Sequence, residues 1–271
     1  MVELFSVKKS THRAIEAIST PQQHRTYLGM SMLGHSCERF LWYTFRWCYI
    51  DEHSARMTRL LNRGHREEEA LIDLLKQVGV NVYGEQTEIV DVHGHVKGHL
   101  DGIGKGLHEA PKTEHVLEFK TMNDSAFKAV KKDGVKVSKP LYYAQCQLYM
   151  NGTGLTRTMF MAVNKNDDSL YMERIKSDGH TADTLLRRAD NIVLSERPPI
   201  RKYKKSWYEC KWCSARELCH FDGAPTKSCR ICTNCDLETK GRWSCSFLAD
   251  EILGEQMQRE MCREFNQMDL D

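Results

Sequence analysis

The 271-residue sequence contains no long hydrophobic run and has almost no net charge. No stretch of about 18 apolar residues is present, so no transmembrane helix is predicted. The first residues, Met-Val-Glu-Leu-Phe-Ser-Val-Lys-Lys, do not follow the pattern of a signal peptide. The net charge of +2 neither favours nor excludes a nucleic-acid partner, because local patches matter more than the sum. We therefore expect a globular cytoplasmic protein with reduced thiols.

Cysteine, in contrast, is abundant. In a reducing compartment, the 11 cysteines are expected to be metal ligands or buried thiols rather than disulfides. Aliphatic residues are sparse between residues 201 and 247, so a metal contributing about 10–16 kcal/mol could supply what packing lacks. Cys48, Cys146 and Cys262 are interpreted as structural. Seven others form two C-terminal groups, Cys210-x2-Cys213-x5-Cys219 and Cys229-x2-Cys232-x2-Cys235-x9-Cys245, and the second group predicts a zinc site.

A short alternating stretch, Val116 to Lys120, predicts a strand, because strand side chains change face at every residue. Glu118 and Lys120 then share one face. If a strand carrying Asp101 lies beside it, two carboxylates and one ammonium converge, and hard cations such as Mg²⁺ take oxygen ligands of this kind. A salt-bridged hairpin face is the alternative interpretation.

Two predicted helices carry further polar residues. Residues 59–78 have helical spacing of apolar residues, end at Gly79 and contain His65, which would otherwise be an ordinary surface or core histidine. A second helix begins at Pro140, a favoured first position. Its Gln145 and Tyr149 are four residues apart and share a helix face, although an aromatic core stripe would have similar spacing.

The remaining pattern predicts an α/β fold. Arg197-Pro198-Pro199 ends a helix and divides a core of residues 1–199 from a cysteine-rich appendage of residues 200–271. The expected strands are a hairpin over residues 81–107 and single strands over 115–121, 157–163 and 169–175, and the expected helices include 180–195 and an amphipathic C-terminal helix over 247–265.

In this order, His65, Asp101, Glu118-Phe119-Lys120 and Gln145-x3-Tyr149 resemble the motifs of the RecB-like branch of the PD-(D/E)XK nuclease superfamily. The resemblance implies a restriction-endonuclease-like mixed sheet flanked by helices. It also implies a DNA exonuclease that uses Mg²⁺ or Mn²⁺ and leaves 5′ phosphates. The metal would be held by His65, Asp101, Glu118 and the Phe119 carbonyl, Lys120 would orient water, and Gln145 and Tyr149 would position DNA or Lys120.

The first cysteine group extends the resemblance. Together with Cys37, far upstream, Cys210, Cys213 and Cys219 resemble the ligands of the iron–sulfur nucleases of this superfamily, the AddB subunit and the CRISPR-adaptation exonuclease. The resemblance implies a four-iron, four-sulfur cluster on these four thiolates, and zinc remains an alternative because it also binds four cysteines. Cys229, Cys232, Cys235 and Cys245 lie outside the resemblance and keep the zinc prediction.

The resemblance implies DNA as partner, single-stranded or with free ends, in recombination, repair or phage DNA processing within a bacterial or phage-infected cell. A homo-oligomer remains open. The alternative is a catalytically weak DNA-binding or adaptor protein that keeps the nuclease fold, which the intact Asp101, Glu118 and Lys120 disfavour. Phosphate contacts are predicted, against the alternative of solvated faces, for the lysines Lys128, Lys131 and Lys132 and for the basic run Arg201, Lys202, Lys204 and Lys205.

Overall fold

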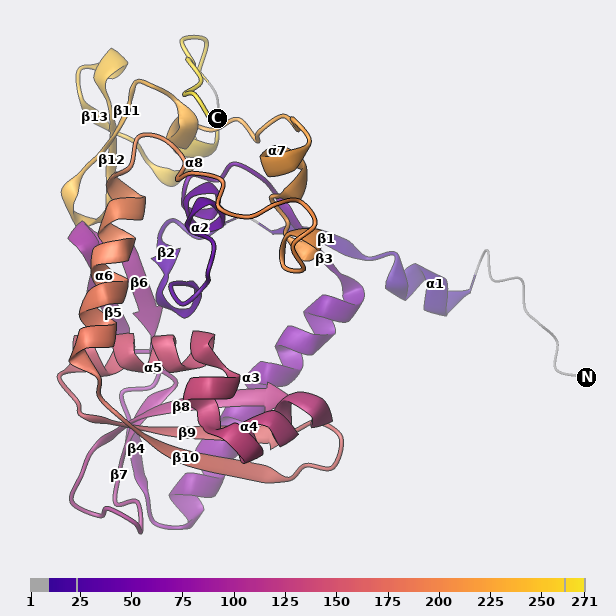
Figure 1. Cartoon of the computed structure of the whole chain (residues 1–271), viewed down its shortest axis with the longest axis vertical. Helices are drawn as coiled ribbons and strands as arrows, with labels where there is room; N and C mark the ends of the chain where they lie inside the picture. Colours follow the sequence, from indigo (N-terminus) through magenta and orange to yellow (C-terminus); the bar gives the residue numbers. More distant parts are fainter. Residues whose placement is uncertain (1–9, 23, 261, 271) are drawn as a thin grey trace, which may run out of the picture.

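A computed structural model describes residues 10–22, 24–260 and 262–270, in which a mixed five-stranded sheet lies between helices (Figure 1). In this sheet, strands β8 (His115–Met122) and β9 (Arg157–Asn164) are parallel, and all other neighbouring strands are antiparallel. The parallel pair requires a crossover, which helices α4 (Asp124–Ser138) and α5 (Pro140–Thr153) provide. The strand order is β10 (Leu170–Lys176), β9 (Arg157–Asn164), β8 (His115–Met122), β7 (Gly102–Lys105) and β4 (Asn81–Tyr83).

The two faces of this sheet belong to different hydrophobic clusters. Leu117 and Phe119 of β8 join Leu71 and Leu75 of the long helix α3 (Ala55–Gln77). Val116, in contrast, joins the cluster that includes α4 and α5. Because strand side chains alternate, Glu118 and Lys120 lie on the face covered by α5.

Most of the predicted elements are confirmed. The helix predicted from Pro140 is α5, with Pro140 at its start, and the predicted helix over 59–78 is α3, which begins one turn earlier. The Ser54 hydroxyl caps α3 by accepting from the Met57 N–H at 3.2 Å. The strands predicted over 115–121, 157–163 and 169–175 are β8, β9 and β10, and the helix predicted over 180–195 is α6 (Gly179–Leu194).

The region predicted as one hairpin, residues 81–107, instead contributes to two sheets. Strands β5 (Glu88–Asp91) and β6 (Val96–His99) form the hairpin and add β2 (Leu28–Gly29), in the order β2-β6-β5. Strands β4 and β7, at the two ends of the region, join the central sheet. The chain therefore changes sheet between β6 and β7, at a bend that contains Asp101.

The N-terminal part forms a small layer with short elements. Helix α2 (Glu38–Phe45) contacts α6, and strand β1 (Ser19–Gln22) pairs with β3 (Asp51–Ser54). The other elements of this part are α1 (Thr11–Glu16) and the 3-10 turn η2 (Met30–Met32), while a further 3-10 turn, η3 (Val92–Gly94), connects β5 to β6. No helix in the described ranges is both long and apolar enough to span a bilayer.

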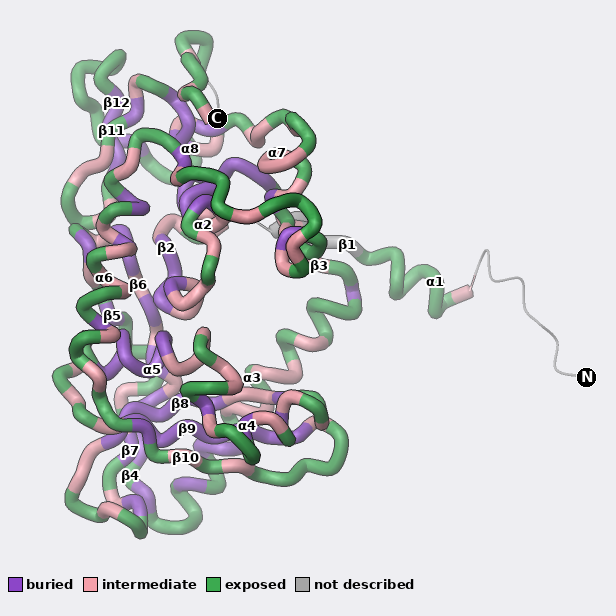
Figure 2. The backbone as a smooth tube through the Cα atoms, in the orientation of Figure 1, coloured by how far each residue is buried: buried purple, intermediate pink, exposed green. Residues whose placement is uncertain are grey.

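The C-terminal part folds back over α2, and the two parts share one buried cluster (Figures 1 and 2). Trp243 packs against Phe45, with ring centroids 5.4 Å apart, and His95 contacts the Glu238 carbonyl at 2.8 Å. Its elements are the sheet of β11 (Cys235–Leu237), β12 (Trp243–Cys245) and β13 (Glu251–Ile252), helices α7 (Arg216–His220) and α8 (Glu255–Arg259), and turns η4 (Cys210–Trp212), η5 (Cys229–Ile231), η6 (Thr239–Gly241) and η7 (Ser246–Leu248).

The predicted C-terminal helix over residues 247–265 is wrong. Among the described residues 247–260 and 262–265, only Glu255–Arg259 is α-helical, as the five-residue helix α8. Ala249 and Asp250 have positive φ angles of 55° and 64°, which end any right-handed helix. Residues 251–252 then pair with β12, so tertiary strand pairing replaces the amphipathic pattern.

A buried arginine joins the C-terminal part to α2. The Arg230 guanidinium donates to the carbonyls of Phe45 (3.0 Å) and Thr26 (2.9 Å) and to the Gln258 side-chain oxygen (2.9 Å). It lies 3.7 Å from the centroid of the Trp47 ring. Burial lowers the pKa of Arg230 well below its ordinary value, so these acceptors and rings must compensate for lost hydration.

We expect Arg230→Met to lower the free energy of unfolding by more than about 3 kcal/mol, because two buried acceptors and one partly buried acceptor lose their donor at about 1–3 kcal/mol each. Urea denaturation followed by circular dichroism measures the change. The exposed Arg242, in the same part of the chain, provides the control, and Arg242→Met should stay within about 0.5 kcal/mol of the original protein. Equal stabilities of the two variants would contradict the role of Arg230.

Candidate active site

The buried carboxyl group of Glu118 is the centre of a hydrogen-bonded cluster on β8. One oxygen accepts from the Lys120 ammonium, and the other accepts from the Gln145 amide at 3.1 Å. The same amide nitrogen contacts the Tyr149 hydroxyl at 3.2 Å. Two motifs that are separate in the sequence, one on β8 and one on α5, therefore meet at a single carboxyl group.

Burial sets the electrostatics of this cluster. Burial raises the pKa of Glu118 to about 8, against the opposing effect of Lys120, while Asp101 adds to the rise. Burial alone would lower the pKa of Lys120, but Glu118 and Asp101 raise it above its ordinary value. Lys120 therefore stays charged, and its ammonium is the positive charge that offsets the burial of both carboxyl groups.

Asp101 reaches the cluster from the bend that precedes β7. In the antiparallel register, Gly102 lies opposite Leu117, and the Asp101 carboxylate accepts the Phe119 N–H at 2.7 Å. Burial raises the pKa of Asp101, while Lys120 and the Phe119 N–H oppose the rise. The lead-in to this bend needs a residue without a side chain, because a Cβ on Gly98 would lie 2.4 Å from Tyr149 Cε1. Gly98 thus allows β6, the strand that leads to Asp101, to pass close to Tyr149 of α5.

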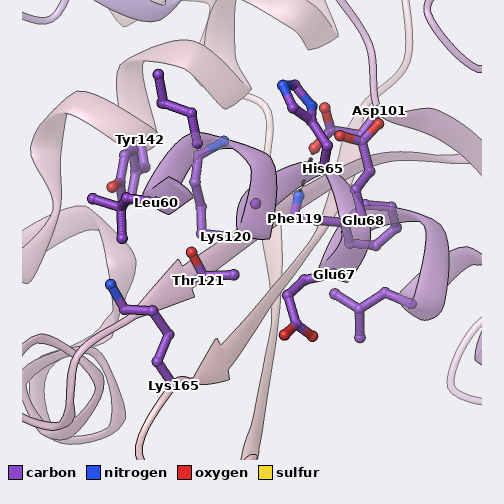
Figure 3. A pocket seen from close by; sticks show the side chains of 13 residues that line it. Leu60, His65, Glu67, Glu68, Asp101, Phe119, Lys120, Thr121, Tyr142 and Lys165 are labelled. Carbon is purple, nitrogen blue, oxygen red and sulfur yellow. Dashed lines mark hydrogen bonds between the residues drawn. The ribbon is translucent and has the colours of Figure 1, made fainter. Parts of the chain in front are cut away.

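A cavity of about 330 Å³ opens beside these residues, between α3 and the end of the sheet. His65 and Glu68 of α3 lie beside Asp101 in its lining (Figure 3). Burial and the Asp101 carboxylate raise the pKa of Glu68, and His65 opposes the rise, which is consistent with close approach of the three groups. The cavity therefore gathers oxygen and nitrogen donors of the kinds that divalent metals bind.

Several lining residues were not singled out from the sequence as functional. Glu68 follows His65 by three residues, so helical spacing could have indicated that they share a face. The aromatic stripe of α5 predicts a core position for Tyr142, but its ring centroid lies 5.3 Å from the Lys120 nitrogen. Thr121 and Lys165 also line the cavity. No local pattern marks Lys165, which reaches the cavity from the turn after β9.

The first cysteine group gathers around a second cavity. Cys37, at the N-cap of α2, lines a cavity of about 360 Å³ together with Cys210 and Cys213. Burial is the main reason that the pKa of Cys213 rises to about 11, and the nearby Cys37, Cys210 and Cys219 add to the rise. The structure thus brings together the four thiols that the resemblance groups, and their chemistry fits a thiophilic metal or cluster.

The second cysteine group also gathers, and it includes one thiol more than predicted. Cys235 and Cys245 lie opposite each other on β11 and β12. Burial raises the pKa of Cys229, and the nearby thiols of Cys232, Cys262 and Cys245 add to the rise. Cys262 therefore lies near this group. The structure therefore offers five thiols, of which a tetrahedral zinc would take four.

These donors are neighbours, but they are not arranged around a common point. Across residues 10–22, 24–260 and 262–270, no three His, Cys, Asp or Glu side chains are arranged to hold a metal ion. Metal binding at the cavity or at the cysteine groups would therefore require side chains to turn.

The lysines predicted to contact phosphates are solvent-exposed. Lys128, Lys131 and Lys132 lie on α4, where Lys128 pairs with Asp124 at 2.8 Å. The basic run Arg201, Lys202, Lys204 and Lys205 is also exposed, in the segment between α6 and η4. Both positions are compatible with phosphate contact and with solvated faces.

We expect Glu68→Gln to weaken Mn²⁺ binding about tenfold, because the variant removes a negative charge facing Asp101 and His65. Electron paramagnetic resonance of free Mn²⁺ measures the affinity. Glu69→Gln removes the same charge from an exposed position one residue later and should leave the affinity unchanged. Equal effects of the two changes would show that Glu68 acts only through net charge.

No protein-family model matches this chain, and no curated protein matches it. Among solved structures, the crystal structure of SSO0001 gives a TM-score of 0.44 at 16% identity, covering 73% of this chain and 87% of that one. The alkaline exonuclease LHK-Exo from Laribacter hongkongensis gives 0.44 at 17% identity over 63% and 87%. Its complex with dAMP gives 0.41 at 14% identity over 62% and 86%. Likeness at this level carries no argument about function.

Proposed function

We propose that this chain is a metal-dependent deoxyribonuclease that hydrolyses phosphodiester bonds and leaves 5′ phosphates. The observation that carries the proposal is the convergence of His65, Asp101 and Lys120 on one cavity, with the buried Glu118 carboxyl group bonded to Lys120. His65 comes from α3, Asp101 from the bend that precedes β7, and both Glu118 and Lys120 from β8. A merely structural salt bridge would need only Glu118 and Lys120, and it would not need a cavity bordered by further carboxylates and a histidine.

The donor chemistry fits Mg²⁺ or Mn²⁺. His65, Asp101, Glu118 and the Phe119 carbonyl would hold the ion, and the position of Glu68 beside Asp101 adds a further carboxylate. When bound, such an ion polarises a phosphate and makes a water molecule more acidic. Burial raises the pKa values of Asp101 and Glu118, and the nearby Lys120 opposes both rises.

Lys120 is the residue that would orient water and stabilise negative charge on the phosphate. Its ammonium is positioned by the Glu118 carboxylate and by the face of the Tyr142 ring. Gln145 in turn holds Glu118 through its amide, and Tyr149 contacts that amide. In this arrangement Gln145 and Tyr149 are positioning residues that act through Glu118.

Exonuclease action on DNA ends, in recombination, repair or phage DNA processing, is the part of the proposal that rests on the RecB-like resemblance. One observation favours the alternative of a DNA-binding or adaptor protein. Glu118 and Lys120 bond to each other directly, as in a structural ion pair. Release of acid-soluble nucleotides from DNA with Mn²⁺ or Mg²⁺ separates the two, because only the nuclease releases them.

Asp101→Ala, Glu118→Gln and Lys120→Met should each lower the cleavage rate by at least about 10²-fold, the scale for losing one electrostatic stabiliser. Affinity for DNA should change little. Lys105→Met is the matched control, because Lys105 is an exposed lysine on the neighbouring strand, paired with Glu114. Undiminished cleavage by the first three variants would refute the assignment.

For the cysteine groups, we propose two separate structural centres. Cys37, Cys210, Cys213 and Cys219 would hold a four-iron, four-sulfur cluster, with zinc as the alternative at the same thiolates. Cys229, Cys232, Cys235 and Cys245 would hold zinc. The first centre would connect α2 to residues 210–219, and closing so long a loop constrains the unfolded chain.

Anaerobically purified protein should be brown and contain iron, sulfide and about one zinc ion per chain. Cys37→Ala should remove the iron and lower the melting temperature while zinc stays bound. Cys146→Ala is the control, because Cys146 is buried and lies in α5, away from both groups in sequence. A colourless protein with two zinc ions would refute the cluster, and zinc loss from Cys37→Ala would refute the pairing of cysteines.

A further inference from the structure

The segment from Ile200 to Phe221 presents aromatic rings to solvent. The Trp212 side chain is 89% exposed and Tyr208 is 65% exposed, although tryptophan and tyrosine usually bury most of their surface. Tyr203 and Trp207 stack on each other, with centroids 3.7 Å apart and planes 13° apart. We call Tyr203, Trp207, Tyr208 and Trp212 the aromatic platform.

The platform lies in a locally positive part of a nearly neutral chain. Six basic and only two acidic residues occur between Ile200 and Phe221. Both acids have partners: Glu209 accepts from the hydroxyls of Tyr208 and Ser36, each at 2.8 Å, and Glu217 pairs with Arg216 at 3.6 Å. In the described chain, no salt bridge joins Lys202, Lys204 or Lys205 to a carboxylate.

Three of the rings lie beside the first cysteine group. Trp212 belongs to the turn η4, between Cys210 and Cys213, and it borders the same cavity as Cys37. Trp207 and Tyr208, which precede Cys210 in the sequence, also border that cavity. The platform therefore lies on the same stretch of backbone as the thiols, and its two most exposed rings, Trp212 and Tyr208, are not packed into the core.

We propose that the aromatic platform binds unpaired bases of a single nucleic-acid strand. Exposed ring faces stack on bases in a sequence-tolerant manner, and neighbouring lysines follow the phosphates. In a duplex, each base already stacks on its neighbours, so its faces are not available to Trp212 or Tyr208. This inference rests on the proposed nuclease function and specifies its substrate as a single strand or an unpaired end.

Binding is best measured in the Asp101→Ala background without added divalent metal, so that cleavage does not interfere. The probes are a fluorescent oligothymidylate of about 20 nucleotides, longer than common single-strand sites of about 4–16 nucleotides, and a duplex of the same length. Trp212→Ala should weaken binding of the single strand about tenfold, the scale for one base–aromatic stack, and change duplex binding less than about twofold.

Two controls isolate stacking from charge and shape. Ile200→Ala removes an apolar side chain of the same segment that is 87% exposed and has no ring face, so it should not change binding. Trp212→Phe keeps a ring and should keep most of the affinity. The slope of log affinity against log salt should be the same for Trp212→Ala and the parent, because tryptophan carries no phosphate-neutralising charge.

An unchanged affinity of Trp212→Ala for the single strand, or an equal loss for strand and duplex, would overturn the inference. Gel filtration showing a dimer that Trp212→Ala dissociates would also overturn it and assign the rings to a contact between copies. The outcome is independent of catalysis. A protein that lacks nuclease activity but passes this test keeps the platform, and an active nuclease that fails it loses only the platform.

Discussion

The hydrogen-bonded pair of Glu118 and Lys120 is the interaction on which the arrangement of the site depends. It lies on the central strand β8. The bend before the neighbouring strand β7 carries Asp101, which accepts from the Phe119 N–H of β8. Helix α5, which covers this face, carries Gln145, whose amide donates to Glu118. A fully buried carboxyl group needs these partners, because burial disfavours its charge. Loss of either partner would therefore leave one oxygen of Glu118 buried without a donor.

A second constraint connects this site to the rest of the molecule. The C-terminal part cannot bury a core of its own, so it packs Trp243 and Arg230 against α2 and η3. That packing carries residues 210–219 next to Cys37 at the start of α2. The exposed rings of the aromatic platform therefore lie on the folded-back tail beside these thiols, while the cavity beside Asp101 lies between α3 and the sheet.

Local patterns predicted many of the elements because the interactions that form them are local. The alternation around Glu118, the spacing of α3 and Pro140 at the start of α5 each depend on a few neighbouring residues. The failures occur where distant segments compete. Residues 251–252 pair with β12 instead of forming a helix. Between β6 and β7, the chain passes from one sheet to another. Neither choice is visible in a short window.

The sequence by itself determined which chemical groups are present and which of them share a strand or helix face: Glu118 with Lys120, Gln145 with Tyr149, and the spaced cysteines. Only the tertiary structure decided that Asp101 reaches Phe119 from a bend, that Glu68 joins His65 beside it, and that Cys262 approaches Cys229. The reason is physical. Backbone periodicity fixes neighbours within an element, whereas contacts between elements depend on which apolar faces the whole chain can bury together.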